Sequence, residues 1–185
     1  MTLEAFLSRL IPALELSQVP YMVTGSVASS AHSVPRSTLD LDIVIAPTPP
    51  ELLLLMQQFP SNRYYADTEQ ALQALANRSQ FNVIDFATSW KEDFIIAEDT
   101  EYGRTAMKRR RLIQIAGKAI YVSSAEDVII AKLRWAKLSG SERQLRDAAS
   151  IVGAQAEKLD MNYIERWVLE FDVNPQWSAV RKSAS

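Results

Sequence analysis

Cysteine is absent from the 185-residue sequence, and histidine occurs only once. The absence of cysteine excludes disulfides, thiol nucleophiles and cysteine-ligated zinc or iron–sulfur sites. A single histidine excludes a zinc site built on a pair of histidines within one chain. Glycine is scarce as well, with five residues. Any chemistry must therefore come from carboxylates, hydroxyls, lysine, arginine or a bound metal ion.

Long hydrophobic runs are also missing. The longest strongly apolar run covers residues 52–56, far fewer than the roughly 20 residues that span a bilayer. Near the N-terminus, Glu4 and Arg9 stand where a signal peptide requires apolar residues. With 48% hydrophobic and 23% charged residues and a net charge of −2, the composition is typical of a globular protein. We expect a cytoplasmic protein without membrane contact.

The spacing of hydrophobic residues predicts strands mixed with helices early in the chain and helices alone at its end. We expect strands at 21–24, 39–45 and 81–86, and a hairpin of 112–115 with 119–122. We expect helices at 3–17, with a bend or junction at Pro12, and at 26–33, 49–59, 67–78, 124–138, 142–152 and 161–171. Residues 90–107 show no clear pattern.

These elements predict an α/β (mixed α+β) fold in which helices flank a mixed sheet. We expect residues 1–122 to form the α/β core and residues 123–175 to form a helical C-terminal portion. The polar residues 176–185 are expected to be a flexible tail.

Two acidic residues in one apolar strand are the first candidate site. Side chains alternate in a strand, so Asp40 and Asp42 project from the same face while Leu41 and Ile43 face the core. Two carboxylates held in this way can bind one hard cation or a pair of cations. The alternative is an edge strand with a solvated acidic face.

One of the few glycines stands where a strand turns into a predicted helix. Gly25 would allow a close approach to the backbone, and Ser26 would begin the helix, where free N–H groups attract a phosphate. The alternative is an ordinary strand-to-helix turn with a serine cap. Together with the two acids, the turn would place an anion site and a cation site on neighbouring elements.

A third acid, Asp85, lies among apolar residues in the predicted strand 81–86. If this strand pairs with strand 39–45 at about 4.8 Å, the Asp85 carboxylate joins Asp40 and Asp42. The alternative is a solvent-facing aspartate near the end of a strand.

This order of motifs, Gly25-Ser26, Asp40-x-Asp42 and a strand-borne Asp85, resembles the nucleotidyltransferase (DNA polymerase β-like) superfamily. The resemblance implies that Gly25 and Ser26 hold a nucleoside triphosphate. It implies that Asp40, Asp42 and Asp85 bind Mg²⁺, as two ions, with Mn²⁺ as a substitute. Asp85 would also help to deprotonate the acceptor hydroxyl. Arg36 and Thr38, just before the paired acids, fit the bacterial branch of the superfamily and would assist phosphate binding.

The C-terminal half resembles the AbiEii-type abortive-infection toxins and related small bacterial nucleotidyltransferases, through residues 124–133, Arg143 and residues 146–149. This resemblance implies that Lys132 reaches the nucleotide phosphates and that Asp147 supports the site. It also implies a toxin role with a cognate antitoxin. The alternatives are a Lys132 that extends to water and an Asp147 that pairs with Arg143 or lies at the surface beside Arg146.

The acceptor is left open by the sequence. A tRNA, a protein hydroxyl or a small molecule would each fit the chemistry. For tRNA, the basic run Lys108, Arg109, Arg110 and Arg111 would contact backbone phosphates, although such a run is more often the solvated start of a strand. Two rival functions remain: an aminoglycoside-type enzyme that modifies a small molecule, and a catalytically silent protein of the same fold that binds or regulates.

Overall fold

The computed structural model describes residues 3–34, 38 and 40–184. In chain order the elements are α1 (Leu3–Leu16), β1 (Tyr21–Val23), α2 (Gly25–His32), β2 (Asp40–Ile45), α3 (Pro49–Gln57), β3 (Tyr64–Ala66), α4 (Thr68–Asn77), β4 (Gln80–Asp85), β5 (Lys91–Ile96), α5 (Glu101–Arg109), β6 (Arg111–Ile115), β7 (Lys118–Val122), α6 (Ala125–Ser139), α7 (Glu142–Gln155), α8 (Met161–Glu170) and α9 (Asn174–Ala184).

The chain divides into two compact units, a sheet unit and a helical unit. The sheet unit consists of Met1–Thr24 and Thr38–Val122, and the helical unit consists of Gly25–Ser37 and Ser123–Ser185. The expected α/β core at 1–122 is therefore corrected: the segment that contains α2 belongs with the C-terminal helices, because α2 packs on α6 and α7.

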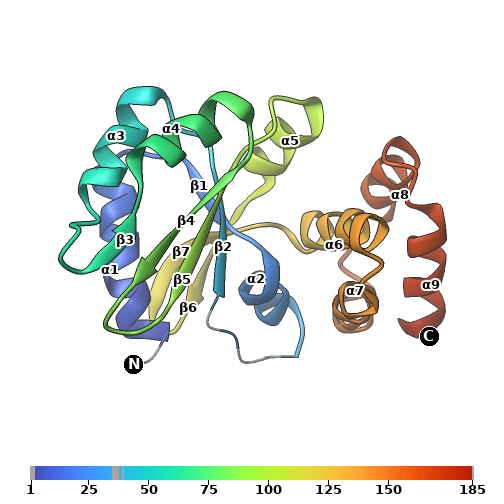
Figure 1. The fold of residues 1–185 in the computed structure, drawn as a ribbon. Helices are drawn as coiled ribbons and strands as arrows, with labels where there is room; N and C mark the ends of the chain where they lie inside the picture. Colours follow the sequence, from blue (N-terminus) through green and yellow to red (C-terminus); the bar gives the residue numbers. More distant parts are fainter. Residues whose placement is uncertain (1–2, 35–37, 39, 185) are drawn as a thin grey trace. The chain divides into compact units, whose positions relative to one another are not determined.

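A mixed sheet in the order β3-β4-β5-β2-β1-β7-β6 is the centre of the sheet unit (Figure 1). The pairs β2–β5 and β1–β7 are parallel, and the remaining neighbours are antiparallel. Parallel pairing requires a long connection, and the chain between β2 and β5 supplies α3, β3, α4 and β4. The mixed α/β class that the sequence predicts is confirmed.

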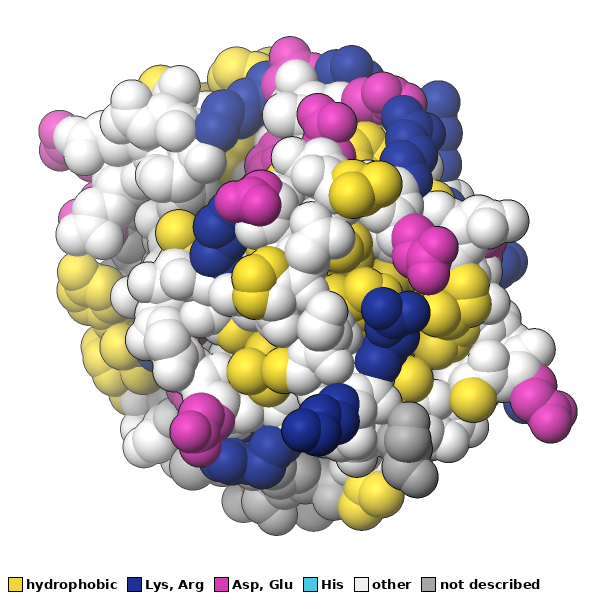
Figure 2. Space-filling model, turned by 90° about the vertical axis from the view of Figure 1, so that its right-hand side faces the viewer, with side chains coloured by type: hydrophobic (Ala, Val, Ile, Leu, Met, Phe, Trp, Pro, Cys, Tyr) yellow, Lys and Arg dark blue, Asp and Glu magenta, His cyan; other side chains and the backbone are white. Residues whose placement is uncertain are grey.

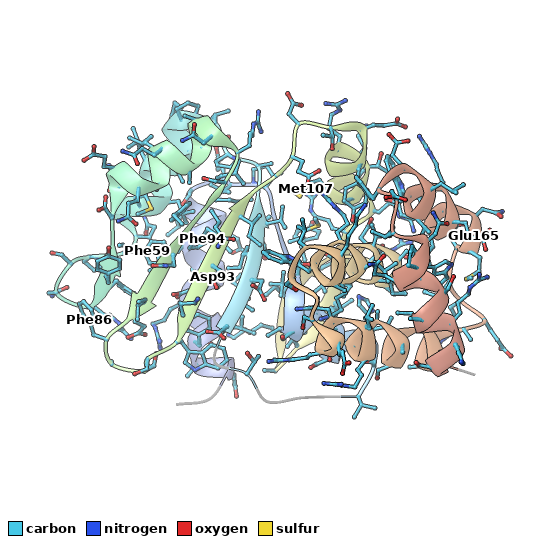
Figure 3. The ribbon with its side chains drawn as sticks, turned by 45° about the vertical axis from the view of Figure 1, so that its right-hand side comes forward. Phe59, Phe86, Asp93, Phe94, Met107 and Glu165 are labelled. Carbon is cyan, nitrogen blue, oxygen red and sulfur yellow. The ribbon has the colours of Figure 1, made fainter. Side chains whose placement is uncertain are left out.

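One face of this sheet is buried and the other is partly accessible. Along β2, β4 and β5 every second residue is buried, the alternation expected of a sheet with one core face. Leu41, Ile43 and Phe94 are fully buried on the core face. Phe59, which follows α3, lies against Phe94 with ring centroids 6.0 Å apart (Figure 3). These contacts fix which side of each strand faces outward.

The helical unit is a bundle in which α7 packs on α6 and α9, and α8 packs on α6. Helix α6 begins where the Ser124 hydroxyl accepts from the Asp127 N–H (3.2 Å) and ends at Gly140, whose φ of 67° places it in the left-handed region. The expectation of a flexible tail at 176–185 is wrong over residues 176–184. Trp177 and Val180 are buried and make α9 part of the bundle.

Most of the other predicted elements are confirmed, with three differences. Pro12 lies inside a single helix rather than at a junction. A short strand, β3, occurs at Tyr64–Ala66, where no strand was expected. Residues 90–107, which lack a clear pattern, contain β5 and α5. In the described part of the chain, no helix has the length and apolar character needed to cross a membrane.

Candidate functional site

The accessible face of β2 carries the two predicted acids. Asp40 is exposed and Asp42 is half-buried, whereas Leu41 and Ile43 between and beyond them are fully buried on the core face. The backbone of Asp42 is held by the residue that follows β1, because the Thr24 N–H donates to the Asp42 carbonyl oxygen (2.8 Å). The same-face arrangement that strand alternation predicts is confirmed.

A carboxylate that the sequence analysis did not single out completes this face. Asp93 on β5 is the direct register partner of Asp42 on the parallel strand β2, and Asp40 pairs with Lys91 in the same ladder. Neighbouring strands lie about 4.8 Å apart, so side chains of register partners adjoin. Asp40, Asp42 and Asp93 therefore share one face of two adjacent strands (Figure 3 labels Asp93).

The Lys91 ammonium lies among these three carboxylates. Its Nζ is 2.8 Å from the Asp93 Oδ2. The hydrogen bond to Asp93 raises the pKa of Lys91, and the negative charges of Asp93, Asp40 and Asp42 raise it further. The cation reduces the repulsion that three nearby carboxylates would otherwise experience.

Asp85 does not join Asp40 and Asp42, and the expectation that it does is corrected. Strand β5 lies between β4 and β2, so the strand of Asp85 is not a neighbour of the strand of Asp42. Asp85 also lies on the other face of the sheet from Asp40 and Asp42, where it is fully buried on the core side. Its Oδ2 pairs with Arg9 (2.6 Å) and Arg63 (3.6 Å). Asp85 is thus a buried partner of two guanidinium groups.

Two carboxyl groups on the core face have opposite pKa shifts. Burial acts to raise the pKa of Asp85, but the hydrogen bonds from the Ala87 N–H and Arg9, with the charges of Arg9 and Arg63, lower it on balance. For Glu92, on β5, a backbone hydrogen bond and the charge of Arg9 act to lower the pKa, but burial outweighs them. Burial raises its pKa to about 8, and the charge of Asp85 adds to the effect. Asp85 is therefore ionised at neutral pH, and Glu92 is largely protonated.

The predicted phosphate-binding turn is the start of α2. Gly25 has a φ of 62°, a conformation that favours glycine, and it directly follows Thr24 at the end of β1. Ser26 is half-buried in the first turn of the helix, where backbone N–H groups have no partner within the helix. This local geometry is the one that anion binding at a helix N-terminus requires.

Two further predicted phosphate ligands precede β2. The Thr38 hydroxyl accepts from the Asp40 N–H (3.1 Å) and donates to the Asp40 carbonyl oxygen (3.2 Å), which fixes the start of the strand. Arg36 lies outside the described residues. Thr38 thus has a local structural role, and its predicted role toward a nucleotide stays a prediction.

Lys132 and Asp147 meet inside the helical unit. The Lys132 Nζ donates to the Asp147 Oδ2 (2.8 Å) and to the Gln144 Oε1 (3.1 Å), which joins α6 to α7. The Lys132 side chain is only 5% exposed, so it does not extend to water. Asp147 pairs with Lys132, and this contact replaces the expected alternatives of a surface position or an ion pair with Arg143.

The basic run is divided between two elements. Lys108 and Arg109 end α5, Arg110 caps it, and Arg111 begins β6. Arg110 lies over the Tyr121 ring, 4.7 Å from its centroid, and donates to the Met107 carbonyl oxygen. A role in RNA binding stays a prediction, because part of the run is used to fix the turn between the two elements.

The carboxylates on the β2–β5 face are of the type that binds magnesium, but their side chains do not lie close enough together to bind one ion. Three carboxylates are hard oxygen ligands of the kind Mg²⁺ prefers. Within residues 3–34, 38 and 40–184, however, no three His, Asp or Glu side chains lie close enough together to hold a metal ion. The Lys91 ammonium provides the positive charge at this face instead. A bound divalent ion would require rotation of Asp40 or Asp42 and release of Asp93 from Lys91.

Asp93 could have been found from the sequence. Lys91, Asp93 and Ile95 alternate with Glu92, Phe94 and Ile96. Asp93 stands just before the apolar run 94–96, as Asp42 stands just before the apolar run 43–45 in β2. The charged residues at the start of the segment hide its alternation. Asp85, in contrast, lies in a strand with a clear hydrophobic pattern, but this strand is not a neighbour of β2 and the Asp85 side chain lies on the core face.

The sequence matches no protein-family model and no curated protein. Similar solved structures include the crystal structure of ANT(2″)-Ia in complex with adenylyl-2″-tobramycin, with a TM-score of 0.61 and 13% identity over 93% of this chain and 98% of that one. The solution structure of the same antibiotic-resistance factor has a TM-score of 0.58 and 13% identity, over 97% and 95% of the two chains.

A nucleotidyltransferase-like protein from Paracoccidioides brasiliensis is also similar, with a TM-score of 0.53 and 15% identity over 97% of this chain and 92% of that one. At such identities the likeness concerns the fold. The nucleotidyltransferase-like fold that the sequence predicts is confirmed.

Proposed function

We propose that this protein transfers a nucleoside monophosphate from a nucleoside triphosphate to a hydroxyl group of an acceptor, with release of pyrophosphate. The observation that carries the proposal is the register of β2 and β5, which aligns Asp42 with Asp93 and keeps Asp40 on the same face. Carboxylates on adjacent strands suit an enzyme that has no cysteine and one histidine, since phosphoryl chemistry depends on charge stabilisation and positioning more than on a protein nucleophile.

Asp40, Asp42 and Asp93 are the residues that would hold Mg²⁺ in this proposal, and Asp93 takes the place predicted for Asp85. Bound Mg²⁺ would neutralise the triphosphate and lower the pKa of the attacking hydroxyl. Asp93 is also the candidate for a base toward that hydroxyl, because it is half-buried and lies on the same face as Asp40 and Asp42.

The triphosphate would bind at Gly25 and Ser26. The N-terminus of α2 offers backbone N–H groups and the positive end of a helix dipole, and the left-handed φ of Gly25 explains why glycine is needed there. Lys132 is held by Asp147 and Gln144, so we propose that it stabilises the helices behind the turn rather than contacting phosphate directly.

A small molecule is the acceptor to test first. ANT(2″)-Ia, which has the same fold over 93% of this chain, was solved with adenylyl-2″-tobramycin. The sequence resemblance to AbiEii-type toxins adds tRNA and protein hydroxyls as further acceptors, with the basic run at 108–111 as the tRNA contact. A toxin role and a cognate antitoxin would follow only if one of these macromolecules is modified.

The test uses each nucleoside triphosphate labelled at the α-phosphate, with Mg²⁺ and either a panel of aminoglycosides, tRNA or cell protein. We expect label transfer to one acceptor class, with a loss of about 100-fold or more in Asp42→Asn and Asp93→Asn. Asp99→Asn is the matched control, because Asp99 is an exposed acid paired with Arg104. Transfer that survives Asp42→Asn would refute the mechanism. No transfer to any acceptor would favour a silent binding protein.

A further inference from the structure

Strand β6 forms one edge of the sheet, at the end of the order β3-β4-β5-β2-β1-β7-β6. It pairs with β7 on one side, and among the described residues no strand pairs with its other side. All of its residues are exposed or half-buried. A free strand edge presents unpaired N–H and C=O groups, to which another extended chain can be added as a further strand.

The turn between β6 and β7 determines which backbone groups point outward. Its residues, 116–117, have φ values of 49° and 75°, as in the type I′ turn of a two-residue hairpin. Such a turn makes Ile115 and Lys118 a hydrogen-bonded pair, and hydrogen-bonded pairs then alternate with other pairs along the antiparallel ladder. The N–H and C=O groups of Leu112 and Gln114 therefore point away from β7, at the free edge.

One face of this edge is apolar and accessible. Leu112 and its register partner Tyr121 on β7 are 58% and 36% exposed. The Arg110 guanidinium lies over the Tyr121 ring, 4.7 Å from its centroid. On the opposite face Ile120 is fully buried, and its register partner Ile113 is half-buried. Apolar side chains of an added strand would therefore bury surface beside Leu112.

The charge of this region favours an acidic partner. The segment 108–122, from the end of α5 through β7, contains five basic residues and no acidic one, although the whole chain has a net charge of −2. The basic residues are Lys108, Arg109, Arg110, Arg111 and Lys118. Opposite charges attract across an interface and like charges repel. An acidic strand is therefore favoured over a second copy of β6.

The backbone edge favours a peptide over a nucleic acid. Arg110 is already used within the protein, since it lies over Tyr121 and donates to the Met107 carbonyl oxygen. Phosphates would pair with other basic side chains but would leave the outward backbone groups and the exposed Leu112 side chain without partners. An extended peptide supplies alternating N–H and C=O groups together with side chains.

We propose that β6 binds an extended acidic segment of a partner protein, which joins the sheet as an antiparallel strand. The segment residues opposite Leu112 and Gln114 exchange backbone hydrogen bonds with them, and their apolar side chains lie beside Leu112. Acidic side chains alternate with these and lie on the face of Arg111. Strand β6 carries none of the acids of the proposed transfer site, so binding can be measured whether or not the protein transfers nucleotides.

The test is fluorescence anisotropy on the full chain with a labelled heptapeptide in which glutamate alternates with valine. One comparison peptide has lysine in place of glutamate. The other is N-methylated at each valine and cannot donate to β6. We expect the acidic peptide to bind with a Kd of about 0.1 mM or lower, more weakly as salt is added, and each comparison peptide at least tenfold more weakly. No saturable binding of the acidic peptide, or equal binding of either comparison peptide, would overturn the proposal.

Two variants locate the site. Gln114→Pro removes an outward N–H, a change that a sheet edge tolerates, and Arg111→Gln removes an exposed charge. Each is expected to weaken binding of the acidic peptide at least threefold, whereas Arg104→Gln, at an exposed arginine on α5, leaves it unchanged. Unfolding curves identify the variants that are folded. Undiminished binding in Arg111→Gln and in folded Gln114→Pro would contradict the assignment.

Two further measurements address the other occupants of this edge. In sedimentation velocity we expect no dimer that Gln114→Pro dissociates, because two basic edges repel each other. Such a dimer would show that a second copy occupies β6. Binding of tRNA that Arg111→Gln weakens, without binding of the acidic peptide, would show a nucleic-acid surface instead. Either result would overturn the proposal.

Discussion

Glu92 and Asp85 show how two carboxyl groups on one sheet face acquire opposite properties. Asp85 accepts from the Ala87 N–H (2.9 Å) and from Arg9 (2.6 Å), and its pKa falls on balance. Glu92 is almost completely buried with one oxygen unpartnered, and its pKa rises to about 8. Both side chains expose almost no surface, but the partners of Asp85 outweigh the effect of burial on its pKa, whereas burial dominates the pKa of Glu92.

The raised pKa of Glu92 predicts a specific pH dependence of stability. An unfolded glutamate ionises near pH 4.5, whereas folded Glu92 keeps its proton to about pH 8. The folded state therefore holds an additional proton between these values, so the free energy of unfolding falls as pH rises through this window and levels off above it. Arg9, Asp85 and Asp93 are the charged groups that affect this titration.

The variant Glu92→Gln is expected to remove this dependence. Its free energy of unfolding should decline less than that of the unmodified protein between pH 5 and pH 9, by roughly 3 kcal/mol. Urea unfolding at the two pH values measures the difference, and Glu69→Gln, at an exposed residue, is the control. Parallel pH profiles for Glu92→Gln and the unmodified protein would show that Glu92 titrates normally.

Two helical glycines make a matched pair for packing. A Cβ at Gly103 on α5 would lie 2.1 Å from the Glu98 carbonyl oxygen, whereas a Cβ at Gly153 on α7 would meet nothing within 4 Å. We expect Gly103→Ala to destabilise the protein by about 2 kcal/mol or more. Gly153→Ala should stabilise it by roughly 0.5–1 kcal/mol, since alanine favours a helix. Denaturant unfolding checks both, and equal effects of one sign would contradict this packing.

Strands and helices with a regular hydrophobic period were predictable from the sequence. The alternation in 39–45 and 81–86 and the turn at Gly117 identified β2, β4 and the β6–β7 hairpin. Strand β5 was missed because Lys91, Glu92 and Asp93 make its first half look polar. Which strands are neighbours depends on pairing over long sequence distances, such as Asp42 with Asp93, and no local pattern contains that information.

Helix α9 was missed for a related reason. Its sequence is polar overall, but Trp177 and Val180 are three residues apart and both are buried. That spacing places them on one helix face, and α7 covers it. Tertiary packing therefore orders a segment that its composition predicts to be flexible.

We expect Trp177→Ala to lower the free energy of unfolding by about 3 kcal/mol, because it removes a large buried side chain and leaves a cavity. Urea unfolding measures the change. Trp135→Ala on α6 is the control, since its side chain is half exposed and should cost less. A cost below about 1 kcal/mol for Trp177→Ala would mean that α9 contributes little to the bundle.

Across the whole molecule, both units expose large apolar side chains, whereas the acidic candidate site belongs to the sheet unit. The sheet unit carries acidic groups on its accessible face and two arginines on its core face. The helical unit exposes Trp135, Leu138 and Leu169, and Figure 2 shows apolar side chains interspersed with basic and acidic ones on the side it presents. The carboxylates of the candidate site therefore lie on the sheet, and the predicted phosphate-binding turn is the start of α2.

The candidate site could be predicted only in part, because strand alternation is visible in the sequence and strand order is not. Asp40 and Asp42 followed from strand alternation, which is local. Identifying the third acid required the strand order and the sheet face of each candidate. Asp93 lies beside Asp42, whereas Asp85 lies on the core face and pairs with Arg9. The central claim of the proposed function is that Asp93 completes the metal-binding set with Asp40 and Asp42.

Electron paramagnetic resonance of Mn²⁺, titrated into the protein with a nucleoside triphosphate, tests this claim most directly. Unmodified protein and Asp85→Asn are compared with Asp93→Asn, and Asp99→Asn is the surface control. The account predicts that Mn²⁺ affinity falls at least tenfold in Asp93→Asn and is retained in folded Asp85→Asn and in Asp99→Asn. Unchanged affinity in Asp93→Asn, or loss confined to folded Asp85→Asn, would contradict it.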